Sequence, residues 1–345
     1  MWFESYLSGR TQTVTVNDQN SKPAAVSFGV PQGSVLGPVL FILYTKPLSS
    51  LIDSHSVSNQ SFADDTQIHD SCPPDQIHAT VQTMQNCIAD VKSWMIQSKL
   101  KLNDDKTEAL SIKSRKPLPT TQPSSIRVGS SDILFSPCAR NLGFMLSDDL
   151  SLDKHISHIC RSAYLEIRKI SSIRQYLTIQ ATKTLVSAFV LSKLDYCNSL
   201  LSGCPMYQLN KLQKVQNSAA RLVLKARKHD HIQPLLQSLH WLPVQARIEY
   251  KLSTLCHNFF SNSSPVYFSD LLTVYTPSRQ LRSSTDTRML RIPSVRTKTF
   301  GHRCFSYNAP KQWNSLPTDL RHTETAPTFK RALKTYLFRQ YYSET

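Results

Sequence analysis

The sequence predicts an α+β protein, in which short strands and helices over residues 1–147 are followed by a mainly helical region. Two patterns indicate this class. Polar and apolar residues alternate over Thr11–Val16, as in a strand, whereas apolar residues recur every three or four positions over Asp75–Ser98, as in an amphipathic helix. The composition changes at about Ser147, and helical spacing follows.

Glycine and proline mark the first elements. Residues 2–7 have the composition of the tail of a helix, which Gly9 ends in a C-cap role. Residues 29–44 combine a loop rich in glycine and proline with an apolar run too short to cross a membrane. We therefore expect a loop followed by a buried helix.

Two adjacent acids, Asp64 and Asp65, lie between short apolar or β-prone flanks over Ser61–Ile68. This pattern is typical of the tip of a β-hairpin. The amphipathic helix that follows carries a single apolar stripe, which predicts packing on a sheet. A strand is expected next, over Lys106–Ile112.

Proline, serine and threonine dominate Ser114–Ser125, which predicts a loop. Short strands are expected after it, at residues 126–128, 133–135 and 142–146.

Three helices are expected downstream of Ser147. Apolar faces place the first over Leu152–Ile170, the second around Leu185–Val190 and the third from Gln208 to about Arg227. Beyond Pro234, aromatic residues interleave with arginines, and we expect irregular structure.

The charge is distributed unevenly along the 345 residues. Residues 1–150 hold 12 Lys plus Arg and 14 Asp plus Glu, whereas residues 151–345 hold 28 and 10. Such asymmetry indicates that the later part binds a polyanion, while the earlier part performs a function that requires carboxylates. The alternative is that the basic part only keeps the protein soluble.

Secreted and integral membrane proteins are disfavoured. The chain has no run of about 20 apolar residues and no apolar stretch after a basic start. Its eight cysteines are widely spaced and form no C-x-x-C pair, so they are interpreted as reduced thiols without a structural zinc site. We expect an intracellular protein, nuclear or cytoplasmic, that makes no membrane contact.

His155, His158 and Cys160 cluster at helical spacing and offer three metal-binding side chains. A structural metal site needs four convergent ligands. We therefore interpret the three as surface and core residues of one amphipathic helix.

The acid pair carries the clearest chemical signal. Two carboxylates at a tight hairpin repel each other unless a cation neutralises them. Mg²⁺ suits this position because it binds one or two carboxylates together with substrate phosphates. Solvated turn acids are the default interpretation of such a pair taken alone, so the surrounding motifs decide.

Three further segments accompany the acids: Gly29–Pro38 about 30 residues before, Leu100–Thr107 about 40 after, and Asn141–Gly143. In order and spacing, these motifs resemble the reverse transcriptase of non-LTR (LINE-type, jockey-like) retrotransposons. The Phe-Ala-Asp-Asp tetrad is similar to the family's polymerase motif C and the Pro-Gln-Gly loop to motif B. The Lys106 segment is similar to motif D, and the Asn-Leu-Gly segment to the primer grip.

The resemblance implies RNA-directed DNA synthesis, with dNTP added to a primer 3′-OH on an RNA template. Asp64 and Asp65 would hold Mg²⁺, with Mn²⁺ as the alternative, and Lys106 would assist the departing pyrophosphate. The alternative for Lys106 is an exposed lysine at a strand end. Template and nucleotide contacts would fall on Gly29, Pro31, Gln32, Gly33 and Ser34, and primer contacts on Asn141, Leu142 and Gly143.

The implied domains are the C-terminal part of a polymerase palm (1–147), thumb-like helices (148–203) and a basic nucleic-acid-binding region (204–345). Lysine and arginine neutralise phosphates, and aromatic faces stack on unpaired bases, although most aromatics here are expected in the core. The cations expected to bind nucleic acid are Lys211, Lys214, Arg221, Lys225, Arg227 and Lys228.

The sequence departs from the family pattern in one respect. A palm of this kind takes a third carboxylate from motif A, which we expect upstream of the segment at Tyr6, together with the fingers and an endonuclease. The chain is therefore expected to be truncated and to have little polymerase activity alone. Two alternatives remain open: a non-enzymatic RNA- or DNA-binding protein acting through residues 151–345, and a remnant without a stable fold.

Overall fold

The structure is a computed structural model that describes residues 2–31, 33–113, 123–277, 288–297 and 300–342. The chain divides into two compact units. Unit 1 comprises Met1–Ala139 with Ser147–Asp149, and unit 2 comprises Arg140–Leu146 with Leu150–Thr345. No helix of the described residues is long and apolar enough to span a bilayer.

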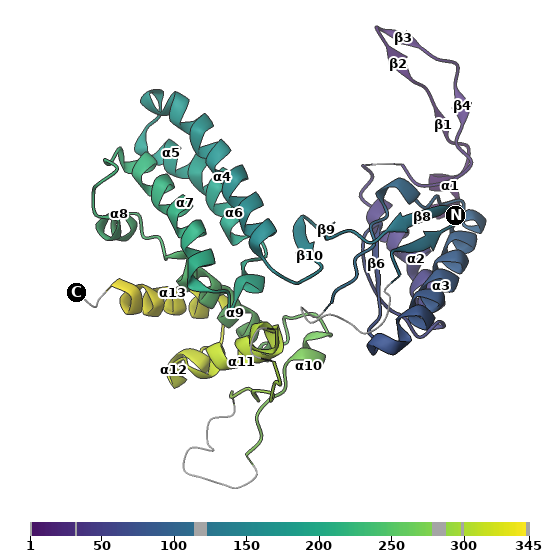
Figure 1. Ribbon diagram of the computed structural model, residues 1–345. Coiled ribbons are helices and arrows are strands. Elements are labelled where there is room, and N and C mark those ends of the chain that lie inside the picture. The colour runs from purple at the N-terminus through teal and green to yellow at the C-terminus, as the bar shows by residue number, and fades with distance from the viewer. Residues whose placement is uncertain (1, 32, 114–122, 278–287, 298–299, 343–345) are drawn as a thin grey trace. The chain divides into compact units, whose positions relative to one another are not determined.

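Unit 1 begins with helix α1 (Trp2–Leu7), after which Gly9 adopts a φ of 64°. The predicted helix tail and its glycine end are thus confirmed. The expected strand over Thr11–Val16 is interrupted after Gln12, and its two pieces join an exposed arm of four short strands (Figure 1). The arm consists of β1 (Thr11–Gln12) paired with β4 (Ala24–Ala25) and β2 (Thr15–Val16) paired with β3 (Gln19–Asn20).

Two helices form the body of unit 1 (Figure 1). Helix α2 (Gly37–Asp53) has a proline in its first turn, where the missing N–H costs nothing, and packs on α3 (Ile77–Gln97). Tyr44 Oη donates to Ser98 O at 2.7 Å and ties the two helices together. The core between them is small, and its buried members are Leu48, Ile52, Val57, Cys87 and Val91.

The prediction of a buried helix over residues 29–44 is wrong for its apolar run. Val39, Ile42 and Leu43 are all more than half exposed, and the buried residues Leu48 and Ile52 lie in the second half of α2. The reason is that the apolar contacts of α2 with α3, and its bond to β5, lie in this second half, whereas Tyr44 adds only a polar contact to the end of α3.

Small two-stranded sheets complete unit 1. The described residues form such pairs rather than one wide sheet, so α3 packs on α2 and on strand β7 of one small pair rather than across a wide sheet face. The strands expected near 126–128 and 133–135 are confirmed. The antiparallel pairs are β5 (Ser58–Phe62) with β6 (Asp65–His69) and β7 (Ser125–Val128) with β8 (Ser131–Leu134).

The strand expected over Lys106–Ile112 is reduced to one bridge between Ala109 and Phe135. The 3₁₀ turn η2 (Asp104–Lys106) replaces its beginning. Lys92 on α3 holds this turn through Asp104 at 2.6 Å, which bends the chain where a strand would have to run straight. A further 3₁₀ turn, η1 (Pro74–Gln76), precedes α3.

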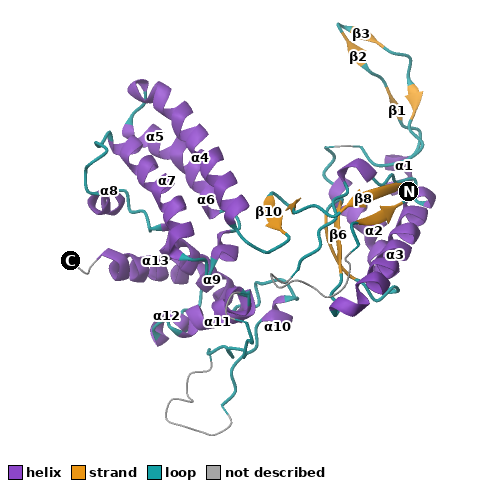
Figure 2. Ribbon diagram, viewed as in Figure 1, coloured by secondary structure: helices purple, strands orange, loops and turns teal. Residues whose placement is uncertain are grey.

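A hairpin of β9 (Cys138–Asn141) and β10 (Phe144–Ser147) leads into unit 2, so the strand expected over 142–146 begins two residues later. Unit 2 is helical (Figure 2). Its α-helices are α4 (Asp153–Ile173), α5 (Ile179–Val186), α6 (Ser192–Asp195), α7 (Met206–Leu224), α8 (Ile232–Ser238), α9 (Val244–Phe260), α10 (Phe268–Leu271), α11 (Phe305–Asn314), α12 (Thr318–Arg321) and α13 (Ala326–Tyr342). Shorter turns are η3 (Arg174–Tyr176), the π-helical η4 (Ser187–Leu191), η5 (Asn198–Leu201) and η7 (Gly301–Arg303).

The three helices expected downstream of Ser147 are confirmed as α4, α5 with η4, and α7. The irregular structure expected beyond Pro234 is wrong, because α8, α9, α11 and α13 lie there. One continuous core joins these helices to α4 and α7. At its centre the indole of Trp313 packs on Phe260 and Phe329, so these aromatics are core residues rather than exposed stacking platforms.

Candidate functional site

The acid pair lies at the tip of the β5–β6 hairpin, as the sequence predicts. Ala63 and Asp64 form the two-residue turn, and Asp65 opens β6 opposite Phe62. Ala63 has a φ of 55°, whereas Asp64 keeps a negative φ, which is the pattern of a type II′ turn that normally takes glycine first. Both carboxylates are exposed, so the turn presents two acids to whatever approaches the tip.

Two exposed carboxylates fit the donor preference of Mg²⁺, which takes oxygen ligands and keeps positions for substrate phosphates. In the parts of the chain that the structure describes, no group of three or more His, Cys, Asp or Glu side chains converges on one point. The hairpin alone therefore offers a partial ligand set. A metal at Asp64 and Asp65 stays a prediction.

The glycines of the 29–34 loop adopt conformations that only glycine takes readily. Gly29 has a φ of 79° and Gly33 a φ of 82°. Apart from its two chain neighbours, no described residue has a heavy atom within 4 Å of where a Cβ would stand on either glycine, and both are exposed, as is Pro31. The backbone is thus open to a close approach. Gln32 lies outside the described residues.

Ser34 is anchored within the structure. Its Oγ accepts a hydrogen bond from Tyr6 Oη at 2.6 Å and from the Gly37 N–H at 3.1 Å. A Cβ on the buried Gly37 would stand 3.1 Å from this Oγ. Ser34 therefore fastens the loop to α1 and to the start of α2, a structural role that the sequence analysis did not assign to it.

Lys106 ends the η2 turn and is exposed. The neighbouring Asp104, rather than Lys106, makes the anchoring ion pair with Lys92. Gly129 leaves space for the Lys92 side chain, since a Cβ on Gly129 would stand only 2.2 Å from Lys92 Nζ. Lys106 thus stands free of this contact on a fixed turn, and its assignment to pyrophosphate stays a prediction.

Residues 141–143 form a tight turn instead of a strand. Asn141 ends β9, and Leu142 and Gly143 have φ values of 45° and 83°, as in a type I′ hairpin. Tyr196 Oη donates to Leu142 O, and the Tyr196 ring lies 3.5 Å from where a Cβ on Gly143 would stand. The turn is therefore held by Tyr196, a residue that the sequence analysis did not single out.

The cations assigned to nucleic acid lie on α7 and just beyond its end, as expected, with the apolar side of the helix in the core. Lys214, Arg227 and Lys228 are exposed. Lys225 is exposed as well, and it ends the helix with a φ of 53°. This part of the chain thus presents four exposed cations close together in sequence.

The other two assigned cations are engaged in the structure. Lys211 Nζ lies 3.5 Å from Asp153 Oδ1, in a pair that is about half exposed. Arg221 is half-buried and donates to Asp230 O at 3.1 Å. The Asp230 carboxylate accepts the N–H of Arg227 at 2.6 Å, so Arg221 and Asp230 shape the loop that displays Arg227.

His155 is a core residue. It is 2% exposed, its ring lies 3.9 Å from that of Phe144 between centroids, and its Nδ1 accepts the Met145 N–H at 3.3 Å. Burial, and secondarily the charge of His158, lower the pKa of His155 to about 4. His155 is therefore neutral at physiological pH and joins α4 to β10.

Arg174 is another residue that sequence reasoning missed. It is buried and donates to the carbonyls of Leu222 and Val223 at the C-terminal end of α7, at 2.9 and 2.8 Å. A third bond reaches Leu177 O at 2.7 Å. An arginine suits this position because the last carbonyls of a helix lack partners within it. Arg174 lies between the apolar faces of α4 and α5, and this position is the sequence feature that could have indicated its burial.

Residues 1–146 match the family of reverse transcriptases (RNA-dependent DNA polymerases). The probable RNA-directed DNA polymerase from transposon X-element of Drosophila melanogaster is 26% identical over 232 residues, covering 64% of this chain and 24% of that protein. The corresponding protein from transposon BS of the same species is 25% identical over 231 residues, with 64% and 25% covered.

The RNA-directed DNA polymerase from mobile element jockey of Drosophila melanogaster is 22% identical over 228 residues, with 64% and 24% covered. The chain spans about a quarter of the length of the curated relatives it matches. No solved structure matches it. Residues 1–146 are therefore similar to a reverse transcriptase domain of retrotransposon type, and the chain shows distant similarity to the polymerases of jockey-like non-LTR elements.

Proposed function

We propose that the chain acts in RNA-directed DNA synthesis for a retrotransposon, with Asp64 and Asp65 as metal ligands and unit 2 holding nucleic acid. The observation that supports this best is the presentation of two adjacent exposed acids at the tip of a tight hairpin, one in the turn and one at the start of β6, within the matched region. A solvated turn has no need of two adjacent carboxylates, whereas a metal that meets substrate phosphates does.

The remaining assigned residues would position the substrates. Bound Mg²⁺, or Mn²⁺, would lower the cost of charge on the attacking and leaving oxygens. The open backbone at Gly29 and Gly33 would admit template and incoming dNTP, and Lys106 would face the pyrophosphate. The turn that Tyr196 holds at Asn141–Gly143 would support the DNA primer.

Iron-directed cleavage tests the metal role without requiring turnover. Fe²⁺ that replaces Mg²⁺ reduces added hydrogen peroxide to hydroxide and a hydroxyl radical and is itself oxidised to Fe³⁺, and the radical cuts the backbone next to the ion. With an oligo(dT) primer on poly(rA), we expect cuts near residues 62–66 in the full chain and their loss in Asp64→Asn and Asp65→Asn. Asp18→Asn is the matched control, since Asp18 is also an exposed acid in a two-residue hairpin turn.

Unchanged cleavage in the Asp64 and Asp65 variants would contradict the metal role. Primer extension on the same template gives a second readout. Robust Mg²⁺-dependent extension that Asp64→Asn abolishes would support the metal role and overturn the expectation that the chain alone has little activity.

A second candidate function is nucleic-acid binding without catalysis, through unit 2. The excess of cations in residues 151–345 and the exposed set on α7 favour it. Its signature would be a binding constant that falls steeply with salt and is unaffected by Asp64→Asn. If Asp64→Asn loses the iron-directed cuts but keeps its affinity for nucleic acid, metal binding and nucleic-acid binding are separate properties of the chain.

A further inference from the structure

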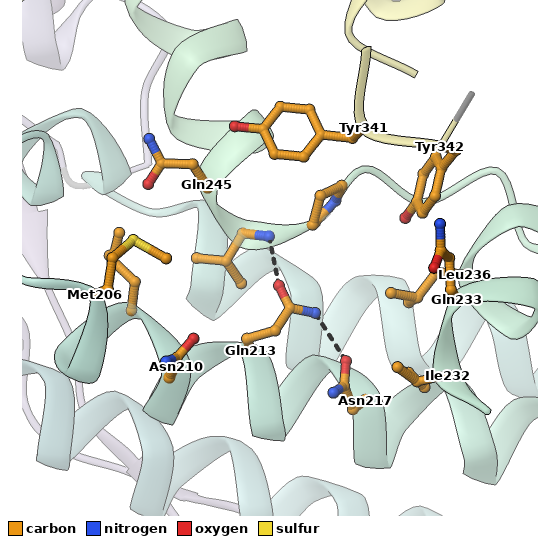
Figure 3. Close-up of a pocket in the computed structure, with 13 residues that line it drawn as sticks. Met206, Asn210, Gln213, Asn217, Ile232, Gln233, Leu236, Gln245, Tyr341 and Tyr342 are labelled. Atoms are coloured by element: carbon orange, nitrogen blue, oxygen red, sulfur yellow. Dashed lines mark hydrogen bonds between the residues drawn. The ribbon is translucent and has the colours of Figure 1, made fainter. Parts of the chain in front are cut away.

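Unit 2 contains a pocket that the assigned residues do not explain. Its volume is about 310 Å³, at the small end of ligand pockets, and it lies among α7, α8, the start of α9 and the end of α13 (Figure 3). Its apolar wall includes Ile232 and Leu236. The polar groups around it are amides and tyrosines, and none of its lining residues is charged.

Gln213 organises the α7 side of the pocket. Its Oε1 accepts the Val244 N–H at 2.8 Å, and its Nε2 donates to Asn217 Oδ1 at 2.8 Å (Figure 3). The same Nε2 donates to Gln216 Oε1 at 2.9 Å. These bonds orient Asn217 so that its own N–H groups are left over to donate.

Other amides add unused hydrogen-bonding capacity. The side chains of Asn210 and Gln233 have no hydrogen-bond partner among the residues that the structure describes. Gln245 donates through Nε2 to Glu249 at 2.9 Å, which leaves its carbonyl oxygen to accept. The pocket therefore offers both donors and acceptors without a net charge.

Tyr341 provides an aromatic wall across the pocket from the α7 amides (Figure 3). Its Oη donates to Glu249 Oε1 at 2.8 Å, which fixes the ring. Burial, followed by the Glu249 charge, raises the pKa of Tyr341, so the phenol stays protonated. Tyr342 beside it is held by a bond from its Oη to Trp241 O at 2.6 Å.

A cation lies on the same face of α7. Lys214 follows Asn210 by four residues and precedes Asn217 by three, and such spacings bring side chains together on one helix face. Lys214 is exposed. A ligand with a neutral, planar, hydrogen-bonding part and a negative part nearby would satisfy both the pocket and this lysine.

We propose that this pocket takes an unpaired base of single-stranded nucleic acid, with Lys214 on an adjacent phosphate. Amides pair with base edges that carry both donors and acceptors, and aromatic rings stack on base faces in a sequence-tolerant way. The inference rests on the proposed role of unit 2 in holding nucleic acid. It adds that unit 2 distinguishes single strands from duplexes.

Fluorescence anisotropy with the full chain tests the proposal. The probes are labelled 20-nucleotide single strands of RNA and DNA and a 20-base-pair duplex. Asn210→Ala with Gln233→Ala removes two amides that have no partner to lose, and we expect about tenfold weaker single-strand binding and less than twofold change for the duplex. Gln175→Ala with Gln180→Ala is the matched control, because both are exposed glutamines of unit 2 outside the pocket.

Lys214→Gln distinguishes the phosphate contact from the base contact. Because both probes carry phosphates, this variant should bind single strands and duplex more weakly alike. Photo-crosslinking locates the base directly, and a 4-thiouridine strand should crosslink to Tyr341 or a residue next to it. Equal effects of the double amide variant on both probes, or crosslinks only outside the pocket, would overturn the proposal. Neither readout depends on Asp64 or Asp65, so either idea can fail alone.

Discussion

Units 1 and 2 differ in how they hold their candidate functional residues. In unit 1 the acid pair, the glycine loop and Lys106 lie on short, exposed elements around a small core between α2 and α3. In unit 2 the candidate cations lie on α7 and just beyond its end, and the other side of this long helix is buried in a core that runs from α4 to α13. The comparison indicates that unit 2 anchors its candidate residues on a large core, whereas unit 1 carries its candidates on exposed loops and turns around a small core.

Helix α2 shows the same contrast within one element. Its second half is buried against α3, whereas Val39, Ile42 and Leu43 in its first half are exposed. Helix α7 has no such division, because residues along its whole length, from Leu209 to Val223, are buried.

The largest expected effect concerns the core of unit 2. Phe329 is 0% exposed and packs on Trp313 and His257. Phe329→Ala should lower the free energy of unfolding by about 3–5 kcal/mol, because the cavity adds to the lost burial. Urea unfolding followed by tryptophan fluorescence measures it, with Leu43→Ala as an exposed control expected within about 0.5 kcal/mol. Equal costs in the two variants would abolish the contrast between the units.

The second prediction concerns pH. The pKa of His155 is about 4 in the folded state against an ordinary value of 6.5 for histidine, so between these values the unfolded state binds a proton that the folded state does not. Stability should therefore fall as pH decreases from about 6.5 to 4, by about 3 kcal/mol in total. Burial also lowers the pKa of His257, which acts in the same direction.

Urea unfolding at several pH values, repeated with His155→Asn, isolates the share of His155. The variant should lose most of the pH dependence in this window. If His155→Asn leaves the pH dependence of stability unchanged, that dependence arises from other titratable groups.

The third prediction concerns the arginine that caps α7. Arg174→Met keeps most of the apolar stem but leaves the carbonyls of Leu177, Leu222 and Val223 without their donor. We expect a loss of about 2 kcal/mol and faster hydrogen exchange in the last turn of α7. Arg168→Met on the exposed side of α4 is the control. If Arg174→Met does not accelerate hydrogen exchange in the last turn of α7 more than elsewhere in unit 2, the proposed capping role is contradicted.

The smallest effect is expected at the turn that we propose to support the primer. Tyr196→Phe removes the donor to Leu142 O at a half-exposed position. Stability should change by about 1 kcal/mol or less. Hydrogen exchange over residues 141–145 should nevertheless accelerate, and an unchanged rate there would show that the turn holds without Tyr196.

Local patterns determined what could be predicted from the sequence. The acids at Asp64 and Asp65 lie on a hairpin tip because short β-prone flanks leave only a tight turn between them. The single stripes of α3 and α7 likewise predicted their helices. The prediction of irregular structure beyond Pro234 was wrong because α9 is buried on several sides, at Val244, Ala246 and Cys256 among others. It therefore lacks the clear polar face by which an amphipathic helix is recognised in a sequence.

The remaining differences come from long-range contacts. Nothing in Lys106–Ile112 itself shows that Lys92 would hold Asp104 and bend the chain. The structural bonds of Ser34 and the pocket beside Tyr341 also join residues that are distant in sequence. The spacing of apolar residues predicts each helix or strand separately, whereas these features depend on contacts between elements that are distant in sequence.

The division of labour between the units is tested most directly by the salt dependence of single-strand binding. Replacing the exposed cations together, as Lys214→Gln, Lys225→Gln, Arg227→Gln and Lys228→Gln, should flatten the slope of log K against log salt by roughly 3. Asp64→Asn with Asp65→Asn should leave that slope unchanged. An unchanged slope in the cation variant, or an equal change in the acid variant, would contradict the assignment of nucleic-acid binding to unit 2.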